Sequence, residues 1–146
     1  MVGKTKRGKG SKIMAIADRR GLPVAVRVES ASPHEVKLVE RVIEKRLTRK
    51  KPNILIGDQA YDSDPLDQAL WKKHRIKLVA PHKCNRVKPP TQDGRVLRRY
   101  KRRWKIERLF SWLQSYRRVQ TRWEVKAENF LAMVQLACLL ILFRYL

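Results

Sequence analysis

Cysteine and glycine are scarce in this chain of 146 residues, and no apolar run is long. The two cysteines, Cys84 and Cys138, lie far apart and outside any Cys-x-x-Cys pair, which excludes a disulfide-stapled small domain and argues against a zinc site. Six glycines exclude a collagen-like repeat. The longest apolar stretch, 130–143, is interrupted only by Gln135 and is shorter than the roughly 20 residues that span a bilayer.

Acidic residues are few beside basic ones: 13 Asp and Glu face 35 Lys and Arg, which gives a net charge of +22. The hydrophobic fraction of 43% is ordinary for a globular domain and too high for a disordered basic tail. We therefore expect a folded protein whose partner is a polyanion, bound in a strongly salt-dependent way. Nucleic acid is the first expectation. A basic protein at a membrane surface is the competing one, and it depends on the last helix.

Periodicity and turn residues predict alternating strands and helices. Ser32, Pro33 and Glu35 form a capping-box pattern ahead of one helix. The segments on either side of the helix at 65–74 are short and apolar, as in a parallel βαβ unit. The expected elements are a flexible basic lead-in (1–12), a hairpin (12–18 and 22–28), a helix from 33 to about 48–51, a strand (53–57), a helix (65–74), a strand (76–80), a loop (81–94), a basic helix (96–118), a link (122–127) and a buried apolar C-terminal helix (126–146). Together they predict one α/β sandwich with a mixed sheet.

Asp58 follows the buried strand at 53–57 directly. Catalytic and ligand-binding groups gather at the carboxyl ends of strands in open α/β sheets. An aspartate at this point is equally typical of a helix cap, so position alone leaves both interpretations open. Asp62 and Asp64 are read as cap and turn residues.

Glu107 is the single acid between Val96 and Thr121, within a strongly basic and aromatic segment. It either relieves repulsion among the cations or faces a cleft, and helical spacing puts it on a stripe apart from Leu109 and Leu113. The tryptophans nearby are expected in the core. Stacking of these aromatic rings on unpaired bases is the alternative.

Five segments together resemble the DDE transposases of bacterial insertion sequences, closest to the group numbered five among those families. They are GKTKRGKGSKIMAIADRRGLPVAV, SASPHEVKLVE, GDQAYDSDPL, RRYKRRWKIERLFSWLQSYRRV and ENFLAMVQLACLLILFRYL, in the family's order. The resemblance implies an RNase H-like fold, a mixed sheet flanked by helices. It identifies residues 1–146 as part of a DDE catalytic domain that acts in the bacterial cytoplasm, at the nucleoid.

The resemblance also implies site residues. Asp58 matches the family's second catalytic acid and Glu107 the third, both as ligands of two Mg²⁺ or Mn²⁺ ions. Tyr100 and Arg103 match the pattern ahead of that glutamate. The family has a basic residue seven positions after that glutamate. This chain has Gln114 at that position, and Arg117 is a candidate substitute to be tested. The residues expected to position DNA are Tyr100, Arg103, Lys105, Lys9, Lys12, Lys83 and Arg86; a solvated surface charge is the alternative for each cation.

The family's first catalytic acid lies on a first strand that precedes the GKTKRGKGSK segment, so we expect that strand and that acid to be missing here. Asp18 is a poor substitute because it falls in the hairpin turn. The implied reaction is strand cleavage at the ends of the element and transfer of the 3′-hydroxyl to target DNA, and this chain alone is expected to be inactive. Candidate partners are DNA, an upstream-frame polypeptide and a second copy of the chain. A non-catalytic DNA-binding module and a decayed remnant remain alternatives.

Overall fold

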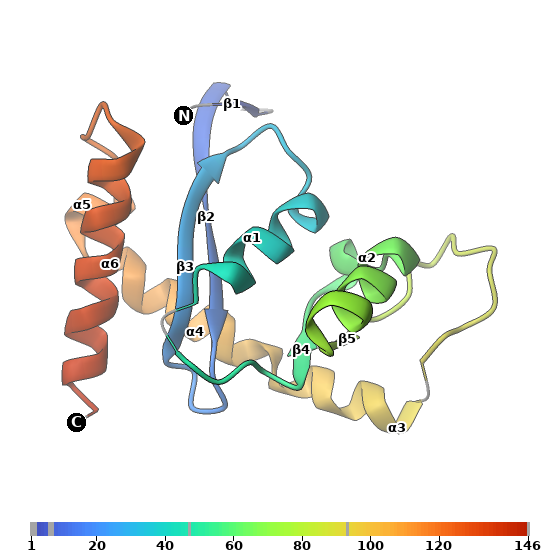
Figure 1. The fold of residues 1–146 in the computed structure, drawn as a ribbon. Helices are drawn as coiled ribbons and strands as arrows, with labels where there is room; N and C mark the ends of the chain where they lie inside the picture. Colours follow the sequence, from blue (N-terminus) through green and yellow to red (C-terminus); the bar gives the residue numbers. More distant parts are fainter. Residues whose placement is uncertain (1–2, 6–7, 47, 93, 146) are drawn as a thin grey trace. The chain divides into compact units, whose positions relative to one another are not determined.

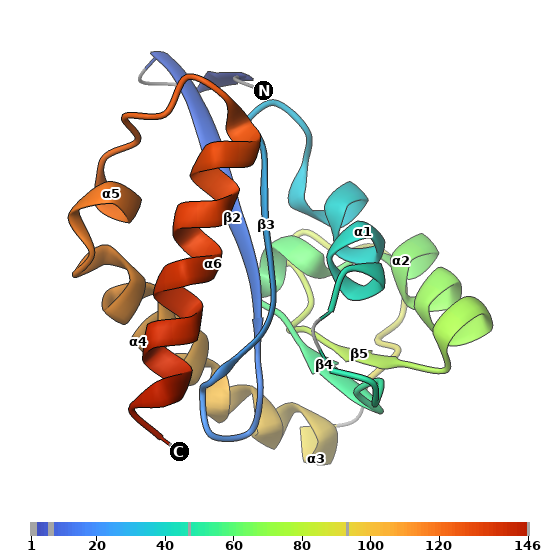
Figure 2. The same cartoon turned by 60° about the vertical axis from the view of Figure 1, so that its left-hand side comes forward.

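A computed structural model describes residues 3–5, 8–46, 48–92 and 94–145. The chain forms two compact units (Figures 1 and 2). The first contains Met1–Thr48 and Lys105–Leu146, and the second contains Arg49–Trp104.

The first unit is built on an antiparallel sheet of β1 (Gly3–Thr5), β2 (Gly8–Ala17) and β3 (Pro23–Ser30). Strands β2 and β3 form the predicted hairpin. One carboxylate oxygen of Asp18 closes its turn by accepting the backbone N–H groups of Arg20 and Leu22, both at 2.8 Å. Gly21 in the same turn has φ = +86°, a left-handed conformation that favours glycine. The predicted hairpin and the turn role of Asp18 are confirmed.

The basic lead-in is not a flexible segment where it is described, because residues 3–5 and 8–12 belong to β1 and β2. Gly3 pairs with Gly10 across the two strands. A Cβ atom on Gly3 would lie 2.3 Å from the Ser30 hydroxyl oxygen, so only glycine permits this approach. Gly3 therefore allows close packing in a segment that was expected to be flexible.

The helix after β3 is short: η1 (Glu35–Leu38) continues into α1 (Val39–Glu44). The predicted capping box is wrong. His34, not Ser32, is the N-cap, and its Nδ1 accepts the Val36 N–H at 3.4 Å. Glu35 pairs with the Lys12 ammonium at 2.6 Å, so its carboxylate is used between elements. The helix also ends well before the predicted 48–51.

Helices cover both faces of this sheet (Figure 1). On one face α4 (Trp104–Gln114) and α6 (Ala127–Phe143) pack on β2 and β3, and on the other α1 packs on the same strands. The short α5 (Arg117–Gln120) contacts α6. The hydrophobic core between the sheet and the helices α4 and α6 includes Val26, Val28, Leu109, Leu113, Val134 and Ile141. The C-terminal helix is buried along one face only, so the prediction of a wholly buried helix is wrong.

The second unit contains the predicted βαβ arrangement. Strand β4 (Ile54–Ile56) pairs in parallel with β5 (Lys77–Val79), and Ile54 lies opposite Lys77. Between them lie η2 (Gln59–Tyr61), α2 (Asp64–Ala69) and η3 (Leu70–His74). The loop predicted at 81–94 precedes α3 (Gly94–Leu97) and η4 (Arg98–Arg103).

The basic segment predicted as one helix over 96–118 is broken. Residues 98–103 form a 3₁₀ helix, and α4 ends at Gln114 because Tyr116 has an extended backbone.

The chain is of the α/β class, as predicted. The described strands form two ladders, one antiparallel and one parallel, instead of the single mixed sheet that was expected. Among the described helices, α6 included, none has both the length and the hydropathy that a membrane crossing requires.

Candidate active site and nucleic-acid interface

Asp58 lies at the carboxyl end of β4. The Gly57 N–H donates to the Val79 carbonyl at 2.9 Å, which extends the parallel ladder to the residue before Asp58. Asp58 is the N-cap of η2, and its Oδ1 accepts the Ala60 N–H at 2.9 Å. The cap interpretation is therefore correct. A carboxylate offers about four acceptor positions, so capping leaves room for a metal ligand.

Gly57 is required beside Asp58. A Cβ atom at position 57 would lie 2.9 Å from Cδ2 of Tyr61. The Tyr61 ring thus packs on the backbone that carries Asp58, and the turn of η2 fixes both residues together.

Glu107 lies on the exposed side of α4, whereas Leu109 and Leu113 of the same helix are buried. The predicted separation of these two stripes is confirmed. Asp58 belongs to the second unit and Glu107 to the first. Gln114 ends α4, and Arg117 follows the extended Tyr116 in α5, so Arg117 does not continue the stripe of Glu107.

A polar network joins the residues after β4 to those after β5, and the sequence interpretation missed it. The Asp62 carboxylate is only 6% exposed. Its Oδ1 accepts from His82 Nδ1 at 2.8 Å and from Arg86 Nη1 at 3.0 Å, and its Oδ2 accepts the Lys83 N–H at 2.8 Å. The second guanidinium nitrogen of Arg86 bonds Asp64 at 2.8 Å.

His82 is held from both sides. Its Nε2 accepts the Thr91 N–H at 3.1 Å, so the network assigns the ring proton to Nδ1, which donates to Asp62. The Gln59 side chain also donates to the His82 carbonyl at 2.8 Å. We name residues 81–92 the clamped loop, because these bonds tie it to the segment that follows Asp58.

The electrostatics of this cluster differ from one aspartate to the next. Burial raises the pKa of Asp62, but the bonds from Lys83 N–H and His82 and the charge of Arg86 together hold that pKa below its usual value. The hydrogen bond from Arg86 likewise lowers the pKa of Asp64. Asp67 behaves oppositely, since burial and the charges of Asp64 and Asp62 raise its pKa. The network therefore stabilises the ionised carboxylates of Asp62 and Asp64, whereas the ionised form of Asp67 is disfavoured.

The expected DNA-positioning residues lie in varied surroundings. In the second unit, the Arg103 guanidinium stacks on the Tyr100 ring at 5.5 Å. Lys83 is exposed, while Arg86 is engaged by Asp62 and Asp64.

In the first unit, the Lys105 ammonium donates to the Arg19 carbonyl in the hairpin turn. The Lys12 ammonium bonds Glu35 and, at 2.8 Å, the Pro33 carbonyl. The Lys9 side chain lies outside the described part of the chain. Lys12 therefore links elements of the fold.

Two tryptophans expected in the core are on the surface. Trp123 is 72% exposed, and Trp104 is half exposed. Trp112 is partly buried, with the Arg108 guanidinium 4.8 Å from its ring and the Tyr145 ring 5.5 Å away. Exposed indole rings amid cations are typical of surfaces that stack on unpaired bases.

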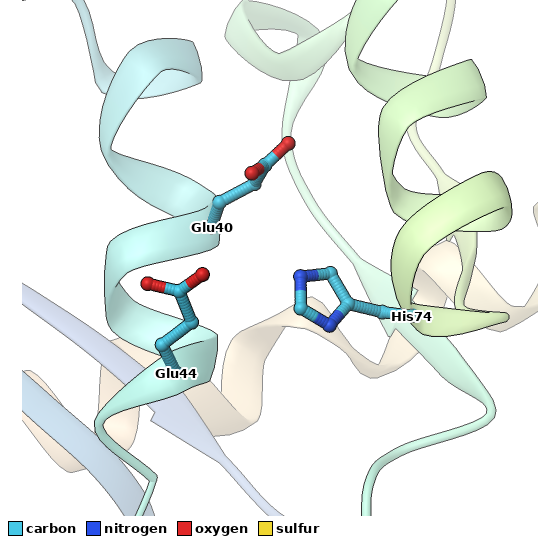
Figure 3. Close-up of side chains that lie close together, drawn as sticks. All are labelled: Glu40, Glu44 and His74. Atoms are coloured by element: carbon cyan, nitrogen blue, oxygen red, sulfur yellow. The ribbon is translucent and has the colours of Figure 1, made fainter.

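Figure 3 draws Glu40 and Glu44 of α1 together with His74, the last residue of η3. The two glutamates are four residues apart and so share one helix face. His74 belongs to the second unit and the glutamates to the first.

Comparison with known proteins gives the class. Residues 2–142 match the family model described as the transposase DDE domain, and the chain belongs to that family. It is similar to a protein of Burkholderia cepacia named as a transposase for insertion sequence element IS402, with 29% identity over 140 residues. That match covers 90% of this chain and 62% of the relative. No solved structure gives a significant match.

Proposed function

We propose that this chain works in DNA transposition, and that Asp58 and Glu107 carry metal-dependent phosphoryl transfer at the ends of an insertion sequence. The reaction would cleave one strand at each end and join the freed 3′-hydroxyl to target DNA. Membership of the transposase DDE family supports this, as does the position of Asp58 at the carboxyl end of a strand in a parallel ladder.

The residues suit a hard divalent ion. Carboxylate oxygens are the ligands that Mg²⁺ and Mn²⁺ prefer, and both proposed ligands are carboxylates on the surface or half buried. Two such ions, when bound, stabilise the attacking and leaving oxygens of an in-line displacement. Transposases of this family use divalent metal ions. We further propose that a third carboxylate comes from outside these 146 residues, supplied by an upstream-frame polypeptide.

The chain's own residues would orient the reaction. The Ala60 N–H fixes the rotamer of Asp58, and the packing of Tyr61 on Gly57 fixes the backbone beneath it. The clamped loop brings exposed Lys83 to the edge of the sheet that carries Asp58, because it follows the carboxyl end of β5. Lys83 would hold phosphates of the DNA at this edge. Arg103 and Lys105 would hold phosphates elsewhere on the chain.

The observation that carries this proposal is Asp58 itself, capped and half buried directly after β4. Asp58→Asn keeps an N-cap acceptor, and Glu107→Gln changes an exposed side chain, so both variants should fold. We expect each to reduce strand cleavage and transfer at least 1,000-fold in the complete enzyme, with DNA affinity within about threefold. Glu128→Gln, an exposed carboxylate on α6, is the control and should leave both unchanged.

The second candidate function is a non-catalytic DNA-binding module that occupies the ends of the element. The charge of +22 and the exposed Trp123 favour it. It predicts DNA binding that weakens steeply with salt and does not depend on metal. Full strand transfer by both Asp58→Asn and Glu107→Gln would contradict our site assignment, and inactivity of every form of the enzyme would favour the module.

A further inference from the structure

A basic and aromatic surface lies where helix η3 ends and strand β5 begins, and the proposed function does not use it. Five residues of this surface are exposed: Trp71, Lys72, Lys73, Arg75 and Lys77. We name them the η3 platform. Four of the five are cations, and the sequence has no acidic residue between Asp67 and Asp93. The platform therefore favours an anionic partner.

Arg75 occupies a position at which glycine is the usual residue. Among the described residues it is the one non-glycine with a positive φ, 57°, in the left-handed conformation that ends many helices. Its N–H donates to the Trp71 carbonyl at 3.0 Å, and the Ile76 N–H donates to the Leu70 carbonyl at 3.2 Å. A Cβ atom destabilises this conformation relative to glycine. Arginine thus costs backbone stability here, and what it adds is its side chain.

That side chain is placed on the tryptophan. The Arg75 guanidinium lies over the Trp71 indole, 5.7 Å from the centroid of the ring. Trp71 is still 54% exposed with this cation in place. The pair therefore presents a planar aromatic surface and a positive charge side by side, which are the two groups that hold a base and its phosphate.

We propose that the η3 platform binds a single-stranded stretch of nucleic acid. An unpaired base stacks on the Trp71 indole, and Lys72, Arg75 and Lys77 hold the phosphates. The ring selects a single strand because the faces of paired bases are covered by their neighbours in a duplex. Stacking beside cations is how proteins bind single strands with little regard to sequence.

The platform is separate from Asp58 within the second unit. Lys77 begins β5 and lies opposite Ile54, the first residue of β4, whereas Asp58 follows the carboxyl end of β4. A strand on the platform therefore lies at the amino end of the parallel ladder and takes no part in the reaction. The proposal shares with the proposed function only its nucleic-acid partner, and it does not depend on the catalytic roles of Asp58 and Glu107.

Charge and composition favour nucleic acid over the other anionic partners. A protein segment that lies on a lipid surface buries a whole apolar face. The platform offers Trp71 alone for that purpose, because its other four members are cations. An acidic peptide would match the charge but would leave the stacked indole without a planar partner.

Fluorescence anisotropy of the full 146-residue chain tests the proposal at 0.15 M salt, with a labelled 12-nucleotide single strand and with a duplex of equal length. Trp71→Ala should raise the dissociation constant at least fivefold for the single strand and less than twofold for the duplex. Trp71→Phe keeps an aromatic ring and should stay within threefold of wild type on both. An equal loss on the two probes, or no loss with Trp71→Ala, overturns the proposal.

A charge-matched pair of variants tests the cations. Lys72→Gln with Lys77→Gln removes two phosphate contacts, so the slope of log K against log salt should flatten by about 1.4 for the single strand. Lys37→Gln with Arg41→Gln removes the same charge from exposed positions on η1 and α1, and should change that slope less than half as much. Equal changes in the two pairs would show that net charge alone binds the strand and would contradict the platform.

Arg75→Gly separates binding from folding. Glycine is favoured at φ = 57°, so this variant should melt at or above the temperature of wild type while binding the single strand at least threefold more weakly. Unchanged affinity would remove Arg75 from the contact and refute its proposed role. An RNA strand of the same sequence identifies the source: a tenfold preference for RNA assigns the platform to RNA, and equal or tighter binding of DNA assigns it to DNA. Trp71-dependent binding to anionic lipid vesicles without binding to either strand would overturn the proposal.

Discussion

Asp62→Asn removes the central acceptor of the network around the clamped loop while keeping the size of the side chain. The aspartate accepts three hydrogen bonds, from His82 and Arg86 on one oxygen and from the Lys83 N–H on the other. An asparagine offers one oxygen and one NH₂ group, so either orientation turns a donor toward at least one of these partners.

The expected loss of stability follows from these three hydrogen bonds. A nearly buried donor that loses its acceptor costs about 1–3 kcal/mol, and the surviving bonds lose the charge that makes them roughly twice as strong as neutral ones. Because the Asp62 carboxylate is only 6% exposed, water can replace few of the lost hydrogen bonds. We expect the free energy of unfolding to fall by about 2 kcal/mol, which lowers Tm by about 6 °C in a chain of this size.

Thermal unfolding at pH 7, with amide exchange of the Lys83 and Thr91 N–H groups, is the assay. Asp67→Asn is the matched control: burial and two neighbouring acids raise the pKa of Asp67, so its neutral replacement should leave stability unchanged or higher. If Asp62→Asn melts within 1 °C of wild type, or no lower than Asp67→Asn, the clamp does not hold the loop.

The pH dependence has a definite sign. The pKa of Asp62 is lowered from 3.8, so its stabilisation is present above that pH and is lost as the pH falls through the folded-state pKa. The stability difference between wild type and Asp62→Asn should be constant from pH 5 to 7 and shrink below about pH 4. A difference that grows on acidification would contradict the assignment.

Three further outcomes are expected. Gly57→Ala places a Cβ atom 2.9 Å from the Tyr61 ring, so it should lower strand transfer more than DNA affinity; equal losses in both measurements would refute this. Leu109→Ala empties a fully buried position and should cost about 3 kcal/mol in denaturant unfolding, and a cost below 1 kcal/mol would show that α4 does not close the core. Burial raises the pKa of Cys138 to about 11, so a thiol reagent at pH 8 should label exposed Cys84 alone until the chain is unfolded.

Local sequence signals predicted the elements that depend on near neighbours. The hairpin follows from the apolar strands around Asp18, and the βαβ unit follows from two short apolar runs flanking a helical one. Asp58 was placed correctly at the end of a strand for the same reason.

Contacts between distant segments decided the features that the sequence interpretation missed. Glu35 fits a capping box locally, but Lys12, 23 residues earlier, takes its carboxylate. His82 gave no signal alone, and Arg86 was predicted to position DNA; their part in the network appears only when parallel β4 and β5 bring Asp62 and Asp64 to the same edge. That shared edge could have suggested the network, since both segments follow the carboxyl ends of neighbouring strands.

The C-terminal helix shows a related limit. Its composition is apolar on all sides, which predicts full burial. The first unit supplies a core for one face only, and the exposed leucines of the other face become visible once β3 and α6 are packed.

The claim that Asp58 binds a catalytic metal ion is tested most directly by changing the ligand atom. In the complete enzyme, Asp58→Cys should abolish strand transfer with Mg²⁺, because a thiolate is a poor ligand for that ion, and should regain measurable transfer with Mn²⁺. Wild type should be active with both ions. Undiminished strand transfer by Asp58→Cys in Mg²⁺ would contradict the account, because it would show that the carboxylate after β4 is not a metal ligand.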